Sequence, residues 1–335
     1  MFFANQKTNK TYKMNRGPMS WTKLLSTLYW RGIPLSYEFL RDASKSVQNS
    51  DSFLKDRFPI RFHSKLKHWR QKGQKEILWC QENQVLICHP LHPLYPKAFL
   101  NFPTPPTLTI LSQKNSLPVP LSSLSVVGSR NPSENSKKWM EVHFKNFLSK
   151  KRRLIVSGGA RGIDQMAHAL CLRTENPTLV FLPSGLNHIY PSHLSSWIQP
   201  ILKGGGAFIS CFSPFSSMKK FYFHIRNHLI ACFTPLTFVV EAKRKSGSLL
   251  TANYAIEEGK EVATLPCSPM DPSGQGNLDL LFEGAHLIRD DSDLFQLMEK
   301  LDTYSSSRDS SSKEESSLLS FCGPPSLSSF TSSSN

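Results

Sequence analysis

Two glycine turns, each with an arginine, are the part of this sequence with the clearest potential for chemistry. Gly128 and Arg130 follow the largely apolar run 124–127, and Gly158 and Arg161 follow a second such run. Each segment has the pattern of a buried strand that runs through a tight turn into a helix. In a parallel α/β sheet these turns meet at one edge, where helix N-termini bind anions. The pattern therefore predicts a site for a phosphate-bearing ligand.

A third candidate segment is the stretch 243–248, in which Lys245 and Ser246 precede the start of a predicted helix. Backbone amides at a helix N-terminus and a nearby lysine together favour a phosphate. The stretch lacks the G-x-x-x-x-G-K-[ST] spacing of a nucleotide-hydrolase loop, and no G-x-G-x-x-G follows the strand at 124–127. Nucleotide hydrolases and dinucleotide enzymes therefore lack their usual signature here.

Aromatic residues alternate with cations just before the predicted helix at 224–233. Phe221, Tyr222 and Phe223 lie beside Lys220 and Arg226. Single-stranded nucleic acid is bound by this mixture, because cations contact phosphates and rings stack on unpaired bases. The alternative is that the phenylalanines are core residues, and we expect about half of the aromatic residues between 212 and 223 to be buried.

Composition favours a polyanionic partner, since 40 Lys+Arg against 25 Asp+Glu give a formal charge of +15. The seven cysteines include no C-x-x-C pair, which indicates a reducing, cytoplasmic compartment. No run approaches the ~18 apolar residues that span a bilayer, so we expect no membrane association. Cys88, His89 and His92 have no second pair of ligand residues nearby, and we expect neither a metal nor a cofactor.

The chain divides by composition into four parts. Residues 1–19 form a basic arm that we expect to be disordered, and residues 20–88 form a small helical module. In this module Trp21, Leu24, Leu25 and Leu28 have helical spacing, and Ser36 is placed to cap a second helix. Residues 89–302 form an α/β core that is proline-rich and extended at its start. Residues 303–335 are rich in serine and predicted to be disordered.

From residue 124 onward, short apolar runs alternate with helical patterns, which is typical of a mostly parallel sheet with helices on both faces. The pattern predicts strands at 124–127, 153–157, 178–182, 207–210, 236–240, 261–265 and 286–288. It predicts helices near 133–149, 163–173, 192–202, 224–233, 248–258, 277–283 and 291–301.

A series of motifs in this region resembles the DNA-processing protein A family, DprA/Smf. They are V-V-G-S-R (126–130), S-G-G-A-R-G-I-D-x-x-A-H (157–168), G-L-x-x-I-Y-P (185–191), R-N-x-x-I-A (226–231), V-V-E-A-x-x-x-S-G-S-L-x-T-A (239–252) and E-G-A-x-L-I (283–288). The resemblance covers roughly residues 89–290. It implies an extended Rossmann-like fold, a homodimer, and a non-catalytic protein that binds and shields single-stranded DNA and loads a RecA-type recombinase during natural transformation.

The resemblance also implies a DNA-binding site. Its predicted residues are Gly128, Ser129, Arg130, Ser157, Gly158, Arg161, Arg226, Asn227, Lys245, Ser246, Gly247 and Ser248. The sequence departs from the family pattern at His228 and Cys232, where Arg and Gly are usual, at Cys267, and at Cys211-Phe212. The winged-helix C-terminal domain of many members is not expected.

Two alternatives remain open at this stage. One is a Rossmann-like, nucleotide-processing enzyme similar to phosphoribohydrolases, although these have a P-G-G-x-G-T loop and a catalytic Glu where this chain has 245–248 after Glu241. The other is a structural module without a ligand. Asp164 and Glu241 are the best catalytic candidates, but we expect both to pair with Arg130, Arg161 or Lys245 and to stay ionised. We expect His168 to be a hydrogen-bonded structural residue.

Overall fold

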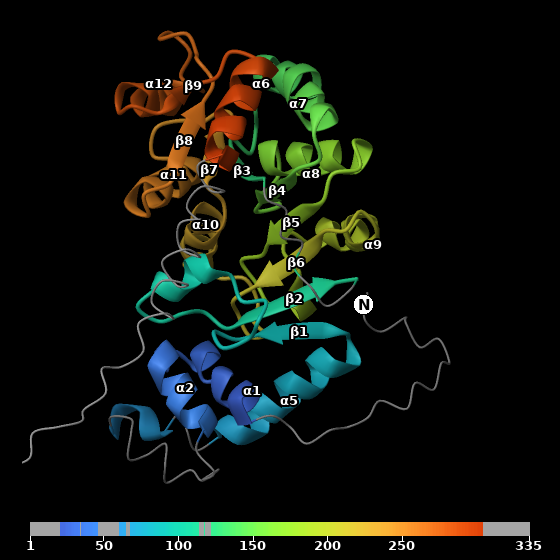
Figure 1. Cartoon of the computed structure of the whole chain (residues 1–335), viewed down its shortest axis with the longest axis vertical. Coiled ribbons are helices and arrows are strands. Elements are labelled where there is room, and N and C mark those ends of the chain that lie inside the picture. Colours follow the sequence, from blue (N-terminus) through green and yellow to red (C-terminus); the bar gives the residue numbers. More distant parts are fainter. Residues whose placement is uncertain are drawn as a thin grey trace, which may run out of the picture.

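A nine-stranded β-sheet forms the centre of the computed structural model, which describes residues 21–33, 35–45, 60–64, 68–113, 117 and 122–303 (Figure 1). The strands are β1 Val85–Cys88, β2 Leu108–Ser112, β3 Ser123–Val127, β4 Leu154–Ser157, β5 Thr178–Phe181, β6 Ala207–Ser210, β7 Leu236–Val239, β8 Glu261–Thr264 and β9 His286–Leu287. Their order in the sheet is β1-β2-β6-β5-β4-β3-β7-β8-β9.

The direction of strand succession reverses in the middle of the sheet. From β3 the chain adds β4, β5 and β6 on one side, then returns to place β7 next to β3 and adds β8 and β9 on the other side. All of these neighbours pair in parallel, whereas β1 and β2 extend the sheet beyond β6 in antiparallel register. In such sheets the crevice at the reversal, outside the carboxyl ends of the strands, is the usual ligand site.

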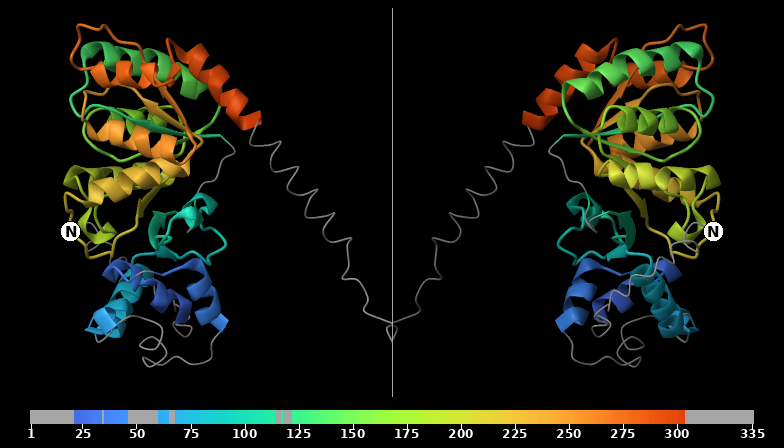
Figure 2. Two further views of the ribbon diagram at one scale, coloured as in Figure 1. Left: turned by 90° about the vertical axis from the view of Figure 1, so that its left-hand side faces the viewer. Right: turned by 90° about the vertical axis from the view of Figure 1, so that its right-hand side faces the viewer.

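Helices cover both faces of the sheet (Figures 1 and 2). Alternation along β3 shows the two sides: Leu124 and Val126 pack under the helices of one face, while Val127 belongs to the core of the other. The first face carries α6 Glu134–Trp139, α7 Lys145–Lys150, α8 Ile163–Arg173, α9 Ile198–Lys203 and a helix over 291–303. The second face carries α10 Tyr222–Phe233 and α11 Gly247–Glu257, with α12 Gln275–Phe282 beside β8.

The expected fold class is confirmed, and each predicted strand agrees with the structure to within one residue at either end. The predicted helix at 133–149 contains a π-helical turn, Met140–Phe144, and the one at 192–202 begins as a 3-10 helix, Ser192–Trp197. Within the described ranges, no helix combines the length and apolar composition that crossing a bilayer requires.

Strands β1 and β2 are absent from the prediction. The prolines on either side of them dominate the local pattern, and β2 is buried throughout, so it shows no alternation of exposed and buried residues. β1 lies within the range expected for the helical module, although it pairs into the main sheet. The expected domain boundaries stay predictions, and the arm at 1–19 and the tail beyond 303 lie outside the described residues.

The helical module consists of α1 Trp21–Ser26, α2 Tyr37–Lys45 and α5 Trp69–Glu82, and it packs against the sheet near β1 and β2 (Figure 1). The predicted cap is confirmed, since the Oγ of Ser36 accepts a hydrogen bond from the Phe39 amide at 3.1 Å. Polar contacts fix the module to the core: Trp30 Nε1 donates to the Thr107 carbonyl, and Thr107 Oγ1 donates to the Ser26 carbonyl.

One buried ion pair links the module to the loop after β6. The Arg31 guanidinium lies 2.9 Å from the Glu76 carboxylate, and both side chains are almost fully buried. Glu76 also accepts a hydrogen bond from Ser213 Oγ at 2.6 Å. The Glu76 carboxylate therefore joins α5 to the 3-10 helix Tyr29–Arg31, which follows α1, and to the loop after β6.

We predict that Arg31→Met lowers the free energy of unfolding by about 3 kcal/mol, because it leaves the Glu76 carboxylate buried without its cation. Urea denaturation followed by circular dichroism measures the change. Arg41→Met is the control, since Arg41 pairs with Asp42 on the exposed side of α2 and its loss should have little effect. The double variant Arg31→Met/Glu76→Met should recover part of the stability; equal losses in the single and double variants would contradict this account.

Candidate functional site

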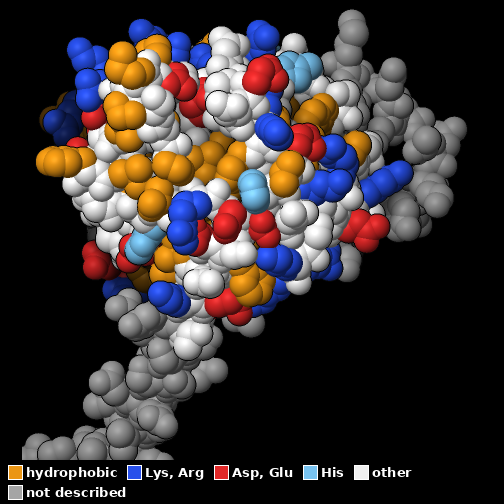
Figure 3. Space-filling view, turned by 90° about the horizontal axis from the view of Figure 1, so that it is seen from above, with side chains coloured by type: hydrophobic (Ala, Val, Ile, Leu, Met, Phe, Trp, Pro, Cys, Tyr) orange, Lys and Arg blue, Asp and Glu red, His pale blue; other side chains and the backbone are white. Residues whose placement is uncertain are grey.

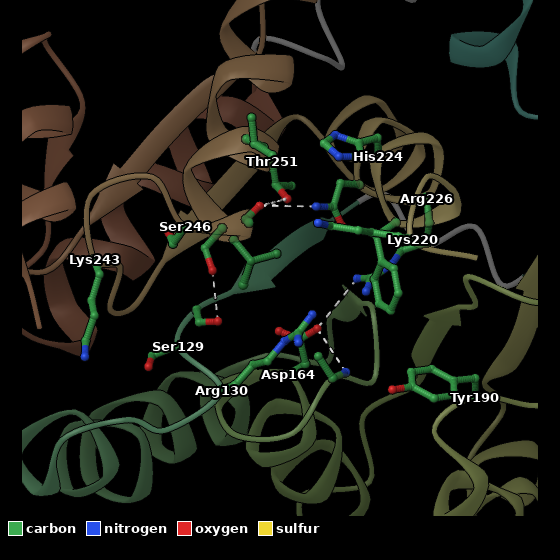
Figure 4. A pocket seen from close by; sticks show the side chains of 18 of the residues that line it. Ser129, Arg130, Asp164, Tyr190, Lys220, His224, Arg226, Lys243, Ser246 and Thr251 are labelled. Atoms are coloured by element: carbon green, nitrogen blue, oxygen red, sulfur yellow. Dashed lines mark hydrogen bonds and ion pairs between the residues drawn. The ribbon is translucent and has the colours of Figure 1, made fainter. Parts of the chain in front are cut away.

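A pocket of about 540 Å³ opens where the strand order reverses between β3 and β7 (Figure 4). It is surrounded mainly by the turn after β3, the beginning of α10, and the turn that leads from β7 into α11. These segments are far apart in the sequence and meet because parallel strands end at the same edge of the sheet. The site therefore forms at the position that the topology favours for ligand binding.

Two arginines point into this pocket from opposite sides (Figure 4). Arg130 is exposed on the turn after β3, and Arg226 is buried in the first part of α10. Both lie over the Phe223 ring, with the guanidinium carbon of Arg130 at 5.6 Å and that of Arg226 at 5.5 Å from its centroid. The ring faces attract both cations, so Phe223 helps to hold two like charges near one another.

The Arg226 side chain is fixed from behind by Asp164 and Gly158. Its Nη1 lies 3.8 Å from the carboxylate of Asp164, which also accepts hydrogen bonds from the amides of Gly158 and Ala160 at 3.2 Å. A Cβ on residue 158 would come within 1.4 Å of Nη1, so only glycine leaves room for the guanidinium. Burial lowers the pKa of Arg226, Arg130 lowers it further, and Asp164 opposes both. An anion bound between the two arginines would therefore stabilise their charged forms.

The N-terminus of α11 forms another wall of the pocket. Ser246 caps the helix, and its Oγ accepts a hydrogen bond from the Leu249 amide. Ser248 Oγ donates to the Gly128 carbonyl at 2.9 Å, and Asn227 Nδ2 donates to the Gly247 carbonyl at 3.2 Å. These bonds connect the turn after β3, α10 and α11, and they orient a positive helix end toward the two arginines.

The structure brings most of the predicted site residues together. Those that line the pocket are Gly128, Ser129, Arg130, Arg226, Asn227, Ser246, Gly247 and Ser248. Ser157 and Gly158 lie behind it, where Ser157 Oγ donates to the Val126 carbonyl at 2.6 Å. Arg161 lines a neighbouring cavity of about 430 Å³ that shares Arg130. Lys245 is exposed, adopts a positive φ of 58°, and is not among the lining residues.

Several further lining residues are absent from the predicted DNA-binding set, among them Tyr190, Lys220, Phe223, His224 and Lys243. Asp164, which was expected to pair with a cation of the site, lines the pocket as well. Lys220 and Phe223 belong to the mixed aromatic and basic stretch, which was the signal that could have identified them. Lys243 lines the pocket, and Lys245 does not; Figure 4 shows Lys243 at the margin of the pocket, apart from Arg130 and Arg226. Among the five aromatic residues at 212, 215 and 221–223, only Phe212 is fully buried, fewer than the expected half.

The expected roles of the carboxylates need correction. Glu241 is buried and accepts hydrogen bonds from the Ser133 amide at 2.9 Å and from Ser136 Oγ at 2.8 Å, so it holds the N-cap residue Ser133 and the first turn of α6 instead of pairing with a cation of the site. Asp164 pairs with Arg226, a partner that was not expected, and burial raises its pKa despite the opposing effect of that arginine. His168 is the expected structural residue, with its Nδ1 2.6 Å from Thr178 Oγ1 in the core.

We predict that Gly158→Ala lowers the free energy of unfolding by ~1–3 kcal/mol, the range for an overpacked interior, because the added methyl group displaces the Arg226 guanidinium. Chemical denaturation measures the loss. The control is Gly204→Ala, where the nearest atom to a new Cβ lies 3.5 Å away and φ is −72°. A Gly158→Ala protein that is as stable as the Gly204→Ala protein would show that Arg226 is not confined as described.

Comparison with known proteins places these features in a family. The chain is 34% identical over 173 residues to the DNA processing protein DprA of Bacillus subtilis (strain 168), a match that covers 52% of this chain and 58% of that protein. It is 33% identical over 218 residues to the protein Smf of Synechocystis sp., covering 64% and 54%. The chain thus spans about half the length of the curated relatives it matches.

Two solved structures share the fold. DNA processing protein A (DprA) from Streptococcus pneumoniae superposes with a TM-score of 0.60 at 25% identity, covering 82% of this chain and 92% of that one. DNA processing protein A from Helicobacter pylori, whose structure concerns its single-stranded DNA binding mode, superposes with a TM-score of 0.55 at 26% identity, covering 65% and 96%.

A match to a whole protein family covers more than half of the chain. The family described as DNA recombination-mediator protein A matches residues 86–299, a range that includes the sheet from β1 to β9 and every wall of the pocket. The chain therefore belongs to the DNA recombination-mediator protein A family, DprA/Smf.

Proposed function

We propose that this protein binds single-stranded DNA in the pocket between β3 and β7. The observation that carries the proposal is the convergence of Arg130, Arg226 and the N-terminus of α11 on one space. Two guanidiniums and a positive helix end repel one another until an anion lies between them, and a phosphate satisfies all three. The relative from Helicobacter pylori, which is described as binding single-stranded DNA, supports this choice of ligand.

Exposed aromatic rings next to the cations favour a single strand over a duplex. Tyr190 is 40% exposed and packs edge to face on Phe223 with ring centroids 6.0 Å apart, and Phe221, the N-cap residue of α10, is 65% exposed. Unpaired bases stack on such rings, whereas the bases of a duplex are already stacked. The neighbouring cavity with Arg161 and Lys137 extends the basic surface from Arg130, so adjacent phosphates of one strand have separate cations.

In this proposal the protein acts in the cytoplasm as a homodimer that protects the strand and delivers it to a RecA-type recombinase. A dimer is supported by exposed apolar side chains at the far end of the sheet: Phe282 on α12 is 95% exposed, Met270 is 89% exposed and Leu287 on β9 is 48% exposed. Figure 3 shows hydrophobic side chains gathered on this end of the molecule. Such a surface is typical of an interaction site.

The proposal includes no catalytic step. Glu241 is held at the N-terminus of α6, and Asp164 is engaged by Arg226 and two backbone amides. A general acid or base must be free to reach the proton that it transfers. Both carboxylates are instead used to position backbone and cations, which disfavours the phosphoribohydrolase-like alternative.

We predict that Arg130→Ala weakens binding to single-stranded DNA by ~10–100-fold, the loss of about one charge-assisted hydrogen bond to a phosphate. Fluorescence anisotropy with a labelled oligonucleotide measures the affinity. Arg173→Ala is the matched control. Arg173 is an exposed arginine at the C-terminal end of α8, whereas the N-terminal end of that helix is the one near the pocket. A lysine of the 1–19 arm, such as Lys13, should also matter less than Arg130. Similar losses in all three variants would place the site elsewhere.

The salt dependence of the same binding reaction gives a second prediction. Each phosphate contact on a single strand adds roughly −0.7 to the slope of log K against log [salt], so Arg130→Ala should reduce the slope by about that amount. The wild-type protein should bind a single strand more tightly than a duplex of the same sequence. A slope that is flat, or tighter binding of the duplex, contradicts the proposed ligand.

Delivery of the strand is tested with the recombinase of the same organism. We predict that the protein accelerates recombinase nucleation on DNA coated with single-strand-binding protein, measured as the lag before strand exchange, and that Arg130→Ala lengthens this lag again. No acceleration by the wild-type protein would overturn the mediator role. Release of free base from nucleoside monophosphates by the same preparation would replace it with the enzymatic alternative.

A further inference from the structure

A second polar cluster lies between α10 and α11, outside the residues that line the pocket. In the described part of the chain, His228, Cys232 and Glu258 form a group whose potential ligand atoms all lie within 4.8 Å of one another. The Nε2 of His228 is 2.8 Å from Oε1 of Glu258.

The backbone fixes all three donors in place. His228 and Cys232 are four residues apart on α10 and therefore project from the same side of the helix. The His228 ring lies against Tyr254, with ring centroids 4.6 Å apart, and against Phe102 at 4.5 Å, so its orientation is constrained. Glu258 is the C-cap residue of α11, which packs directly on α10.

Without a cation, the three donors are poorly matched in charge. Burial raises the pKa of the Cys232 thiol to about 12, the Glu258 carboxylate contributes to this rise, and Lys260 only partly opposes it. The thiol and the imidazole can each share a proton with the one carboxylate. A divalent cation would instead accept a lone pair from sulfur, nitrogen and oxygen together and would favour the thiolate.

We propose that His228, Cys232 and Glu258 bind Zn²⁺. This metal combines with imidazole, thiolate and carboxylate ligands in tetrahedral sites, in which the ligand atoms of this set lie ~3.4–3.6 Å apart. The three ligand atoms lie within 4.8 Å of one another, and the nitrogen and oxygen are already 2.8 Å apart, so the group is compact enough to converge on one ion. His228 and Glu258 retain 27% and 29% of their side-chain exposure, which leaves the fourth position open to water.

The metal would fasten α10 to α11 behind the DNA pocket. Both helices line that pocket with other residues, Arg226 and Asn227 from α10 and Gly247 and Ser248 from α11. A zinc ion at this position would restrict sliding of one helix against the other. Its binding does not depend on the proposed DNA function, and the experiment below reads the metal directly.

The test is titration of the full-length protein with Co²⁺, after chelator treatment and under a non-thiol reductant. Co²⁺ occupies zinc sites and has visible bands in tetrahedral geometry and a near-ultraviolet band when bound to a thiolate. We expect both signals to saturate at one equivalent and to disappear when Zn²⁺ is added. Zn²⁺ should also raise the melting temperature.

Three variants make the assignment specific. Cys232→Ser should remove the thiolate band, and Glu258→Gln, which keeps the shape of the side chain, should weaken Co²⁺ binding by at least ~10-fold. Cys267→Ser is the control, because Cys267 is the partly exposed member of the described cysteines and should not contribute. Each variant should melt near the wild-type temperature in the absence of metal, which separates loss of the site from loss of folding.

The proposal is overturned if the wild-type protein gives no cobalt bands. It is equally overturned if the thiolate band persists in Cys232→Ser, or if Glu258→Gln binds Co²⁺ as tightly as the wild-type protein while remaining folded. In those cases the cluster is a hydrogen-bonded ion pair between His228 and Glu258. DNA binding plays no part in these readouts, so failure here leaves the proposed function standing.

Discussion

The electrostatic repulsion between Arg130 and Arg226 is the interaction around which the pocket is built. Two guanidiniums approach one aromatic ring, and one of them is buried. Placing a buried arginine near a second cation is unfavourable unless its charge is compensated. The surrounding residues provide that compensation in the form of the Asp164 carboxylate and the Phe223 ring.

The fold makes this arrangement possible because the strand order reverses between β3 and β7. The reversal separates the first helices on the two sides of β3 and opens a crevice at their ends. Because residue 158, in the turn after β4, is a glycine, no Cβ occupies the space that the Arg226 guanidinium fills. The capped N-terminus of α11 lies at the same crevice, so the backbone dipoles of this helix and the charged side chains are directed at the same pocket.

Buried carboxylates in this molecule position other groups. Glu76 joins the helical module to the core, Asp164 orients Arg226, and Glu241 holds the N-cap residue of α6. In each case the carboxylate contacts at least one group that is distant in sequence. This use of acidic residues is consistent with a protein that holds a polyanion, since its free positive charges remain available for the ligand.

The sequence by itself determined the strands from β3 to β9, the glycine turns after β3 and β4, and the family. These features depend on local patterns: a short apolar run, a glycine that permits a tight turn, and a helix that starts within a few residues. The negative charge of the proposed ligand was also predicted from the sequence, because the excess of Lys and Arg does not depend on how the chain folds.

Only the tertiary structure decided how the side chains at this edge are paired. Asp164 meets Arg226 although 61 other residues separate them in the chain, and Glu241 turns toward Ser133 and Ser136. Lys243 lines the pocket, whereas Lys245, which was expected there, does not. Strands β1 and β2 likewise depend on an antiparallel edge that their own residues do not reveal. Such pairings are set by long-range packing and burial, and no local spacing encodes them.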